Sequence, residues 1–241
     1  MDFGHMWAIK GQKNYPETSE SGQFWRSTIL DMDSRLRVAR GIAKTETDAS
    51  IIVFETLKER GHPERPPATI SDGWGGIREA MVEVYGTVPP YSGRGRPPTR
   101  KQPGIDWQYL QMVKIRNEQG RLLGVKLRAI FGDKETVINL LGGSTAYIER
   151  THLTMRHFSA RLTRKSLAFS KKLSAFQAAA ALQDAIYNFV RPLKTLRQEL
   201  FDNTHRRWQP RTPAMVANVT DSIWTVKELL TIIPLPVSVN T

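Results

Sequence analysis

Short runs of apolar and aromatic residues, separated by polar turn residues, are typical of strands and fill the first part of the chain. Three such runs follow one another: 3–9, 23–30 and 35–43. Their lengths and the turns between them predict an antiparallel meander of three strands. Apolar residues then recur at helical spacing, which predicts a helix over 48–60 with Thr45 at its start.

Helices and strands alternate in the middle of the chain. The expected elements are a short strand at 68–71, a helix at 77–85 and a hairpin of strands 109–116 and 121–131. Between the helix and the hairpin, residues 86–104 are rich in proline, glycine and arginine, which predicts a basic loop.

The last third of the chain has the pattern of helices. A long helix is predicted to begin after Gly142-Gly143, with Ser144 as its N-cap, and a second helix is predicted at about 174–190. A shorter amphipathic helix is predicted over 221–230, with Asp221 as its cap.

This order of elements predicts a mixed α/β fold of the ribonuclease H-like type. We expect a mixed sheet that starts with the three-stranded antiparallel meander, helices on both of its faces, and a helical C-terminal segment. The expected organisation is one catalytic domain over residues 1–190, containing the basic loop, and a basic, helical tail over 191–241.

Composition narrows the range of functions. With 241 residues, 40% of them hydrophobic, the chain can fill a sizeable core. The absence of cysteine excludes disulfides, cysteine-ligated zinc and thiol catalysis, and the five histidines show no zinc-binding spacing. No run is long and apolar enough for a transmembrane helix, and the N-terminus lacks a signal-peptide pattern. We therefore expect a cytoplasmic protein without a membrane partner.

The positive charge is concentrated in a few segments of a chain whose formal net charge is +12. Residues 150–172 carry seven basic residues and no acid, residues 91–101 carry four and no acid, and residues 191–211 carry six against two acids. Each run alone is compatible with a solvated helix face. Together they favour a surface that binds a polyanion, and nucleic acid is the expected partner.

Three acidic residues stand where the predicted layout would bring them together. Asp2 opens the first strand, Asp72 follows the fourth strand, and Glu149 lies in the first turns of the long basic helix. Each acid alone is as readily a cap or a partner of the helix dipole. Carboxylates that converge from separate elements can instead hold the two divalent metal ions that assist phosphoryl transfer. At helical spacing, Glu149 is expected to share a face with His152 and Arg156.

The helix around Glu149 resembles a known family. Residues 147–156 (YIERTHLTMR) are similar to the Glu-helix of DDE-type insertion-sequence transposases, in the group with a Tyr-Val/Ile-Glu-Arg signature. The resemblance extends over nearly the whole chain, through these further stretches: Trp7 with 10–14, 69–73, 161–172, 187–189, 211–215 and 221–230. Two positions depart from the family pattern, because Phe3 stands where a Glu is usual and His152 where an Asn is common.

The resemblance implies an enzyme that cleaves DNA at a transposon end and joins the freed 3′-hydroxyl to target DNA. Its catalytic, metal-binding triad would be Asp2, Asp72 and Glu149, holding two ions of Mg²⁺ or Mn²⁺. Together with the basic runs, it predicts these DNA-binding residues: Arg94, Arg96, Arg150, Arg156, Arg161, Arg164, Lys165, Lys171 and Lys172.

By the same resemblance, the partners would be double-stranded DNA, as transposon ends and as target, and a second copy of the chain bound to that DNA. Only Met1 precedes Asp2, so we expect an N-terminally truncated chain whose DNA recognition comes from an upstream domain or protein. Two alternatives stay open: an inactive, transposase-derived DNA-binding remnant, and a structure-selective nuclease with the same metal site.

Overall fold

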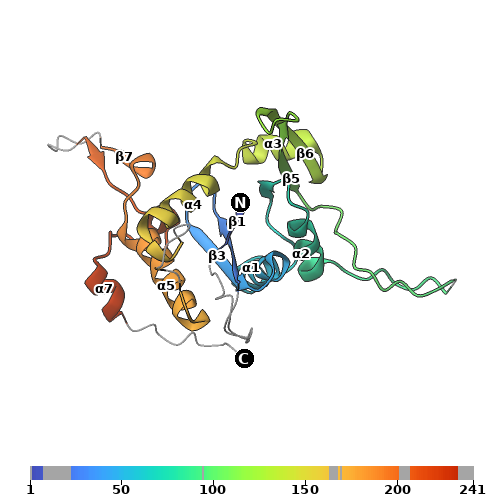
Figure 1. The fold of residues 1–241 in the computed structure, drawn as a ribbon, viewed down its shortest axis with the longest axis horizontal. Coiled ribbons are helices and arrows are strands. Elements are labelled where there is room, and N and C mark those ends of the chain that lie inside the picture. The colour runs from blue at the N-terminus through green and yellow to red at the C-terminus, as the bar shows by residue number, and fades with distance from the viewer. Residues whose placement is uncertain are drawn as a thin grey trace. The chain divides into compact units, whose positions relative to one another are not determined.

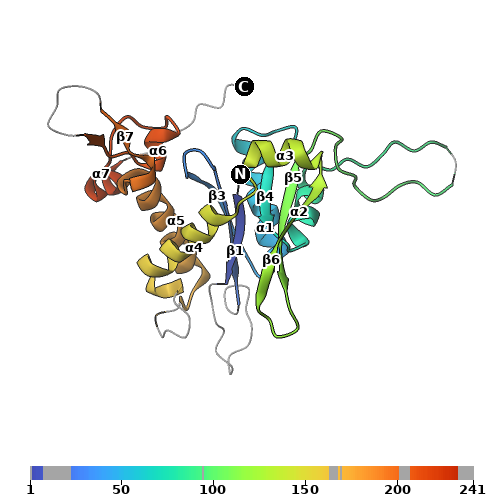
Figure 2. The same cartoon turned by 90° about the horizontal axis from the view of Figure 1, so that it is seen from above.

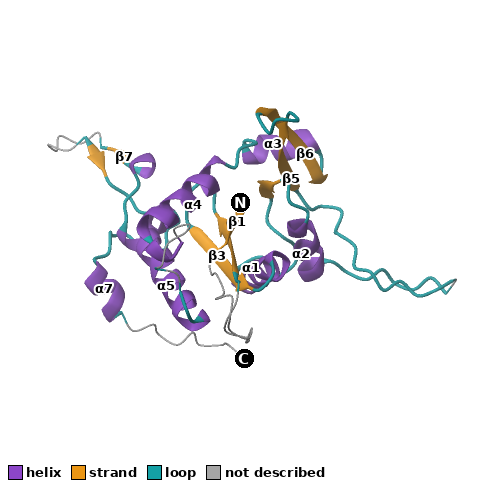
Figure 3. Ribbon diagram, viewed as in Figure 1, coloured by secondary structure: helices purple, strands orange, loops and turns teal. Residues whose placement is uncertain are grey.

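The computed structural model describes residues 2–7, 23–93, 95–162, 168, 170–200 and 207–232, and for residues 2–7 it describes the backbone alone. Helices and strands are both abundant in these residues (Figure 3), so the predicted mixed α/β class is confirmed. The chain divides into two compact units, residues 1–178 and 179–241. No helix in the described residues is long and apolar enough to cross a membrane.

A six-stranded sheet organises the first unit, with the strand order β3-β2-β1-β4-β5-β6. Strands β1, β2 and β3 pair antiparallel in succession, β1 pairs parallel with β4, β4 pairs parallel with β5, and β6 returns antiparallel to β5. The strands are β1 (Asp2–Trp7), β2 (Trp25–Leu30), β3 (Arg37–Ala43), β4 (Thr69–Asp72), β5 (Tyr109–Arg116) and β6 (Leu122–Phe131).

Helices lie on opposite sides of this sheet (Figure 1). They are α1 (Glu46–Arg60), α2 (Gly76–Tyr85), α3 (Lys134–Leu141) and α4 (Ala146–Phe158), followed by the 3-10 turn η1 (Ala160–Leu162). Neighbouring residues of a strand point to opposite faces. Accordingly, Tyr109 packs in one core with residues of α1 and α2, whereas Leu110 packs in another core with residues of α3. Helix α4 contacts β1 and β2, and its Met155 packs against Phe24.

Local sequence explains where α1 begins and ends. The Thr45 hydroxyl accepts a hydrogen bond from the backbone N–H of Asp48, so the predicted cap is confirmed, and Gly61 ends the helix. The buried side of α1 carries Val53, Phe54 and Leu57, and each such side chain stabilises the fold by about 1.5–3 kcal/mol when removed from water.

Helix α3 lies between the predicted hairpin and the predicted long helix. Its N-cap is Asp133, whose side chain accepts a hydrogen bond from the backbone N–H of Thr136. The long helix itself begins at Ala146, and Ser144 accepts the Ala146 N–H although Thr145 occupies the N-cap position.

The second unit consists of short elements. Helix α5 (Leu173–Ala185) begins in the first unit and runs into the second, where the chain continues through a π-helical turn, η2 (Ile186–Val190). The remaining elements are η3 (Lys194–Leu196), β7 (Gln198–Glu199), β8 (Trp208–Gln209), α6 (Pro213–Val216) and α7 (Val226–Thr231). The predicted cap at Asp221 is wrong, because Thr225 forms a capping box with Glu228 and starts α7 there.

Candidate active site

Asp72 stands at the C-terminal end of β4, beside Met112 of β5. Its side chain is exposed, and its Oδ1 atom accepts the backbone N–H of Trp74 at 3.2 Å. This bond fixes the turn that leads from β4 into α2. Within the described residues, the other oxygen of the carboxylate takes part in no hydrogen bond or ion pair.

Glu149 reaches the same region from α4. It is exposed, and its Oε1 atom lies 2.8 Å from the Nζ atom of Lys114 on β5. Because Asp72 pairs with Met112, and Lys114 is the next residue of β5 on that face, Asp72, Met112 and Lys114 share one face of the sheet. The structure therefore brings two of the three predicted acids to one face of the neighbouring strands β4 and β5.

Two contacts hold the N-terminal end of α4 over this face. The Thr145 hydroxyl lies 3.5 Å from the Sδ atom of Met112, next to Asp72 in the sheet. The guanidinium of Arg35, from the turn between β2 and β3, stacks 3.3 Å above the ring centroid of Tyr147. The position of Glu149 is thus fixed by the contacts of its own helix and by the ion pair with Lys114 of β5.

The third predicted acid, Asp2, is known here by its backbone only. It pairs with Leu30 of β2 and with Ile70 of β4, so it lies on the strand next to the one that ends in Asp72. Its side chain lies outside the described residues. Among the side chains that the structure does describe, no three acids or histidines form a group that could hold a metal ion.

Glu46 is an acid near Asp72 that the sequence did not single out as a site residue. It lies in the first turn of α1, and burial raises the pKa of its carboxyl, with the charge of Asp72 as a second cause. Two carboxylates that repel each other in this way favour a bound cation. The only sequence signal was the Thr45 cap, which places Glu46 at the start of the helix.

A buried polar cluster lies beneath Asp72 on the opposite face of the sheet. The Tyr109 hydroxyl lies 2.8 Å from Oγ of Ser71, and it accepts a bond from Nε2 of Gln111 at 2.9 Å. Burial raises the pKa of Tyr109 to about 12. Gln111 also donates to the backbone carbonyl of Trp74, so the cluster ties the turn after Asp72 to β5.

The prediction that Glu149, His152 and Arg156 share one face of the helix is wrong for His152. His152 is only 9% exposed and lies on the packed side of α4 with Ile148 and Met155, whereas Glu149 and Arg156 are exposed. At 100° per residue, position i+3 falls 60° away from position i, which is enough to cross from the exposed to the buried side of a packed helix.

The basic residues predicted to bind DNA have different surroundings. Arg150, Arg156, Lys171 and Lys172 are exposed. Arg161 is exposed too, but it donates from Nη1 to Oγ of the buried Ser170 at 2.9 Å, so it also holds the chain after α4. The remaining two of this run, Arg164 and Lys165, lie outside the described residues.

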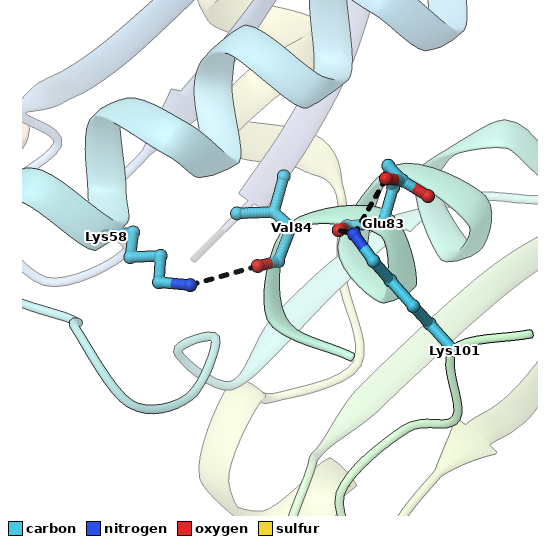
Figure 4. Close-up of polar contacts among 4 residues, drawn as sticks. All are labelled: Lys58, Glu83, Val84 and Lys101. Atoms are coloured by element: carbon cyan, nitrogen blue, oxygen red, sulfur yellow. Dashed lines mark hydrogen bonds and ion pairs between the residues drawn. The ribbon is translucent and has the colours of Figure 1, made fainter. Parts of the chain in front are cut away.

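The basic loop 86–104 is fixed at its base. Thr87 and Gln102 form an isolated antiparallel bridge. The side chain of Lys101 donates a hydrogen bond to the carboxylate of Glu83 near the C-terminal end of α2 (Figure 4). In the same place, Lys58 of α1 donates to the backbone carbonyl of Val84. From this base the loop projects as a long arm (Figure 1) that carries the exposed Arg96. Arg94, the other predicted DNA contact, lies outside the described residues.

A comparison with known proteins found no match: neither a family model nor a curated protein is similar to the chain.

Proposed function

We propose that this chain is the catalytic part of a DDE-type transposase, which cleaves DNA strands in a metal-dependent reaction and transfers the freed 3′-hydroxyl end to target DNA. The observation that carries the proposal is the placement of Asp72 and Glu149 on the same side of the sheet. Asp72 comes from the end of β4 and pairs with Met112 of β5, and Glu149 comes from α4 and forms an ion pair with Lys114, the next residue of β5 on that face.

The sheet supports a ribonuclease H-like assignment for the first unit. Three consecutive antiparallel strands come first, and β4 and β5 then lie parallel to β1 on its other side. In open sheets with parallel strands, sites form beyond the carboxyl ends of those strands. Asp72 stands at such an end, and β1, which carries Asp2, is its neighbour.

The donor chemistry suits Mg²⁺ or Mn²⁺. Asp72 and Glu149 offer hard carboxylate oxygens, and the charge of Asp72 is the second cause, after burial, of the raised pKa of Glu46. Asp72 and Glu149 would hold the ions together with Asp2, whose backbone lies on the adjacent strand. When bound, two such ions activate the attacking oxygen and stabilise the leaving oxygen of an in-line displacement.

The chain's own residues would hold the DNA in place. Arg150 and Arg156 are exposed on α4, the helix that carries Glu149, and the exposed Lys171 and Lys172 directly precede α5. Phosphate contacts of this kind position a duplex without reading its sequence. Binding would weaken steeply as the salt concentration rises.

A strand-transfer assay tests the proposal. The purified chain is incubated with Mn²⁺, a duplex that ends in a free 3′-hydroxyl, and a supercoiled target plasmid. We expect joined products from the unaltered chain, and none from Asp72→Asn or Glu149→Gln. Asp33→Asn, the same change in an exposed turn acid, is the matched control and should leave joining intact. Equal joining by all four proteins would refute the role of these carboxylates.

An inactive, DNA-binding remnant is the second candidate, and the Lys114–Glu149 ion pair is the observation that favours it. A lysine already neutralises one of the carboxylates that a metal would need. This candidate predicts salt-dependent DNA binding without cleavage at any Mn²⁺ concentration. Cleavage without joining would instead point to a structure-selective nuclease.

A further inference from the structure

The hairpin of β5 and β6 leaves its outer half exposed on both faces. On β5, residues 109–111 are buried, whereas residues 114–116 are exposed, and half of the residues of β6 are exposed as well. In Figure 2 the turn of this hairpin extends beyond α1, α2 and α3. A strand pair that merely closed the sheet would bury at least one face of its side chains.

This exposed ribbon is strongly basic. Between residues 109 and 131 the chain has five basic residues, Lys114, Arg116, Arg121, Lys126 and Arg128, and a single acid, Glu118. Lys114 pairs with Glu149, and Arg116 donates to the Gly120 carbonyl in the turn. The other three, Arg121, Lys126 and Arg128, are exposed, and no ion pair in the described part of the chain neutralises them.

Apolar side chains alternate with these cations along the strand, and the two kinds are on different faces of the ribbon. Val125 pairs with Lys114 and shares its face, whereas Lys126 and Arg128 pair with Val113 and Gln111 on the other face. Leu122, Leu123 and Val125 are 50%, 66% and 49% exposed. A second copy of the chain is a poor occupant for this surface, because each copy would bring the same excess of positive charge to the contact. A polyanion that also offers apolar surface fits better. Duplex DNA has both, in its phosphates and in its sugars and thymine methyl groups.

The base of the ribbon adjoins the candidate carboxylates. Lys114 forms the ion pair with Glu149, and two residues earlier Met112 pairs with Asp72 in the sheet. Because the major groove of DNA admits a two-stranded β-ribbon, a duplex whose groove enclosed the ribbon would contact both of its faces and pass next to both acids at its base. The three basic segments recognised in the sequence did not include this hairpin, because its cations are spread over two strands.

We infer that the projecting part of the β5–β6 hairpin, residues 113–128, is a duplex-DNA contact that holds the DNA beside Asp72 and Glu149. Arg121, Lys126 and Arg128 bind phosphates, and Leu123 and Val125 contact sugars and base edges. This inference rests on the proposed function, since it names the surface that presents the substrate to the same site.

The first test is the salt dependence of DNA binding. The triple variant Arg121→Ala/Lys126→Ala/Arg128→Ala is compared with the unaltered chain on a mixed-sequence duplex between low and moderate salt. Each lost phosphate contact should reduce the slope of log K against log salt by about one, so a reduction of about two to three is expected. Arg60→Ala/Arg78→Ala/Lys134→Ala removes the same charge from α1, α2 and α3 and is the matched control.

The second test uses the absence of cysteine in the chain. A single cysteine is introduced as Leu123→Cys on the ribbon or as Glu55→Cys on the exposed side of α1, and is labelled with a photo-crosslinker. The ribbon position should crosslink to the duplex, and the α1 position should not. Thermal melting of each variant shows whether it is folded.

The outcomes separate this inference from the function it rests on. If the unaltered chain binds no DNA, the proposed function fails and the ribbon role fails with it. If the unaltered chain binds DNA, but the ribbon variant keeps its slope and Leu123→Cys gives no crosslink, the ribbon role alone is wrong. A ribbon variant that changes the oligomeric state and leaves the slope unaltered would assign this surface to a second copy instead.

Discussion

The ammonium of Lys114 lies 2.8 Å from the carboxylate of Glu149 and so occupies one oxygen of the acid that the candidate site offers to a metal ion. Both side chains are about half exposed. A divalent ion that used this oxygen would have to displace the lysine. Since an exposed ion pair contributes about 0–1 kcal/mol, the competition is measurable but does not exclude the metal.

Replacing Lys114 with methionine should therefore increase metal affinity. We expect Lys114→Met to bind Mn²⁺ about two- to fivefold more tightly than the unaltered chain, the range that an exposed ion pair allows. Titration followed by electron paramagnetic resonance of free Mn²⁺ measures this directly. Lys126→Met removes the same charge from the same hairpin without touching Glu149 and should change affinity less. Equal affinities of all three proteins would show that the ion pair does not compete with the metal.

The stacking of Arg35 on Tyr147 should stabilise the N-terminal end of α4. A cation over an aromatic ring at such a partly exposed site contributes about 0.5–1 kcal/mol. We expect Tyr147→Leu to lower the melting temperature of the first unit by about 2–4 °C, whereas Tyr147→Phe keeps the ring and should melt like the unaltered chain. Circular dichroism during heating gives the comparison. If the leucine and phenylalanine variants melt alike, the stacking contributes nothing.

The close approach of β3 and α1 depends on Gly41. A Cβ atom at this position would lie 1.8 Å from the backbone carbonyl oxygen of Ala49, which cannot move aside as a side chain can. We expect Gly41→Ala to destabilise the fold by about 1–3 kcal/mol or more in urea unfolding, the cost of overpacking a core. Gly124→Ala in β6 meets no atom within 4 Å and is the control. A stable Gly41→Ala protein would mean that α1 can shift away from the sheet.

Features that depend on neighbouring residues were predictable from the sequence. The Thr45 cap and the hairpin around residues 117–120 follow from local spacing, and the structure contains both. Asp72 and Glu149 could be singled out because a strand end and a helix start are local features too. Their meeting on one face required the expected order of the strands.

Features that depend on the packing of distant elements were not predictable. The partnership of Glu149 with Lys114 is decided by how far α4 lies along β5, which no local pattern encodes. The burial of His152 follows from which side of α4 meets β1 and β2, and its spacing from Glu149 leaves it near the border of the two sides. The position of Glu46 near Asp72 likewise requires the course of α1 across the sheet.

Glu46 gives the last prediction, a dependence of stability on pH. Burial, and next the charge of Asp72, raise the pKa of the Glu46 carboxyl above 4.5, its ordinary value. When a carboxyl has a higher pKa in the folded than in the unfolded chain, it contributes to the free energy of unfolding, and this contribution is complete only at a pH below the pKa of the unfolded chain. That contribution is lost as the pH rises through the folded-state pKa.

The unaltered chain should therefore lose stability relative to Glu46→Gln as the pH rises from about 4 to 7, because the amide stays neutral throughout. We expect a difference below about 1 kcal/mol, since the partly exposed carboxylate is screened by water. Urea unfolding at several pH values measures it, with Glu59→Gln near the other end of α1 as the control. Asp72→Asn removes the repelling charge, so in that background the gain from Glu46→Gln should shrink. A gain that is independent of pH would show that the pKa of Glu46 is not raised by folding, and a gain that Asp72→Asn leaves unchanged would show that the two carboxyls do not interact.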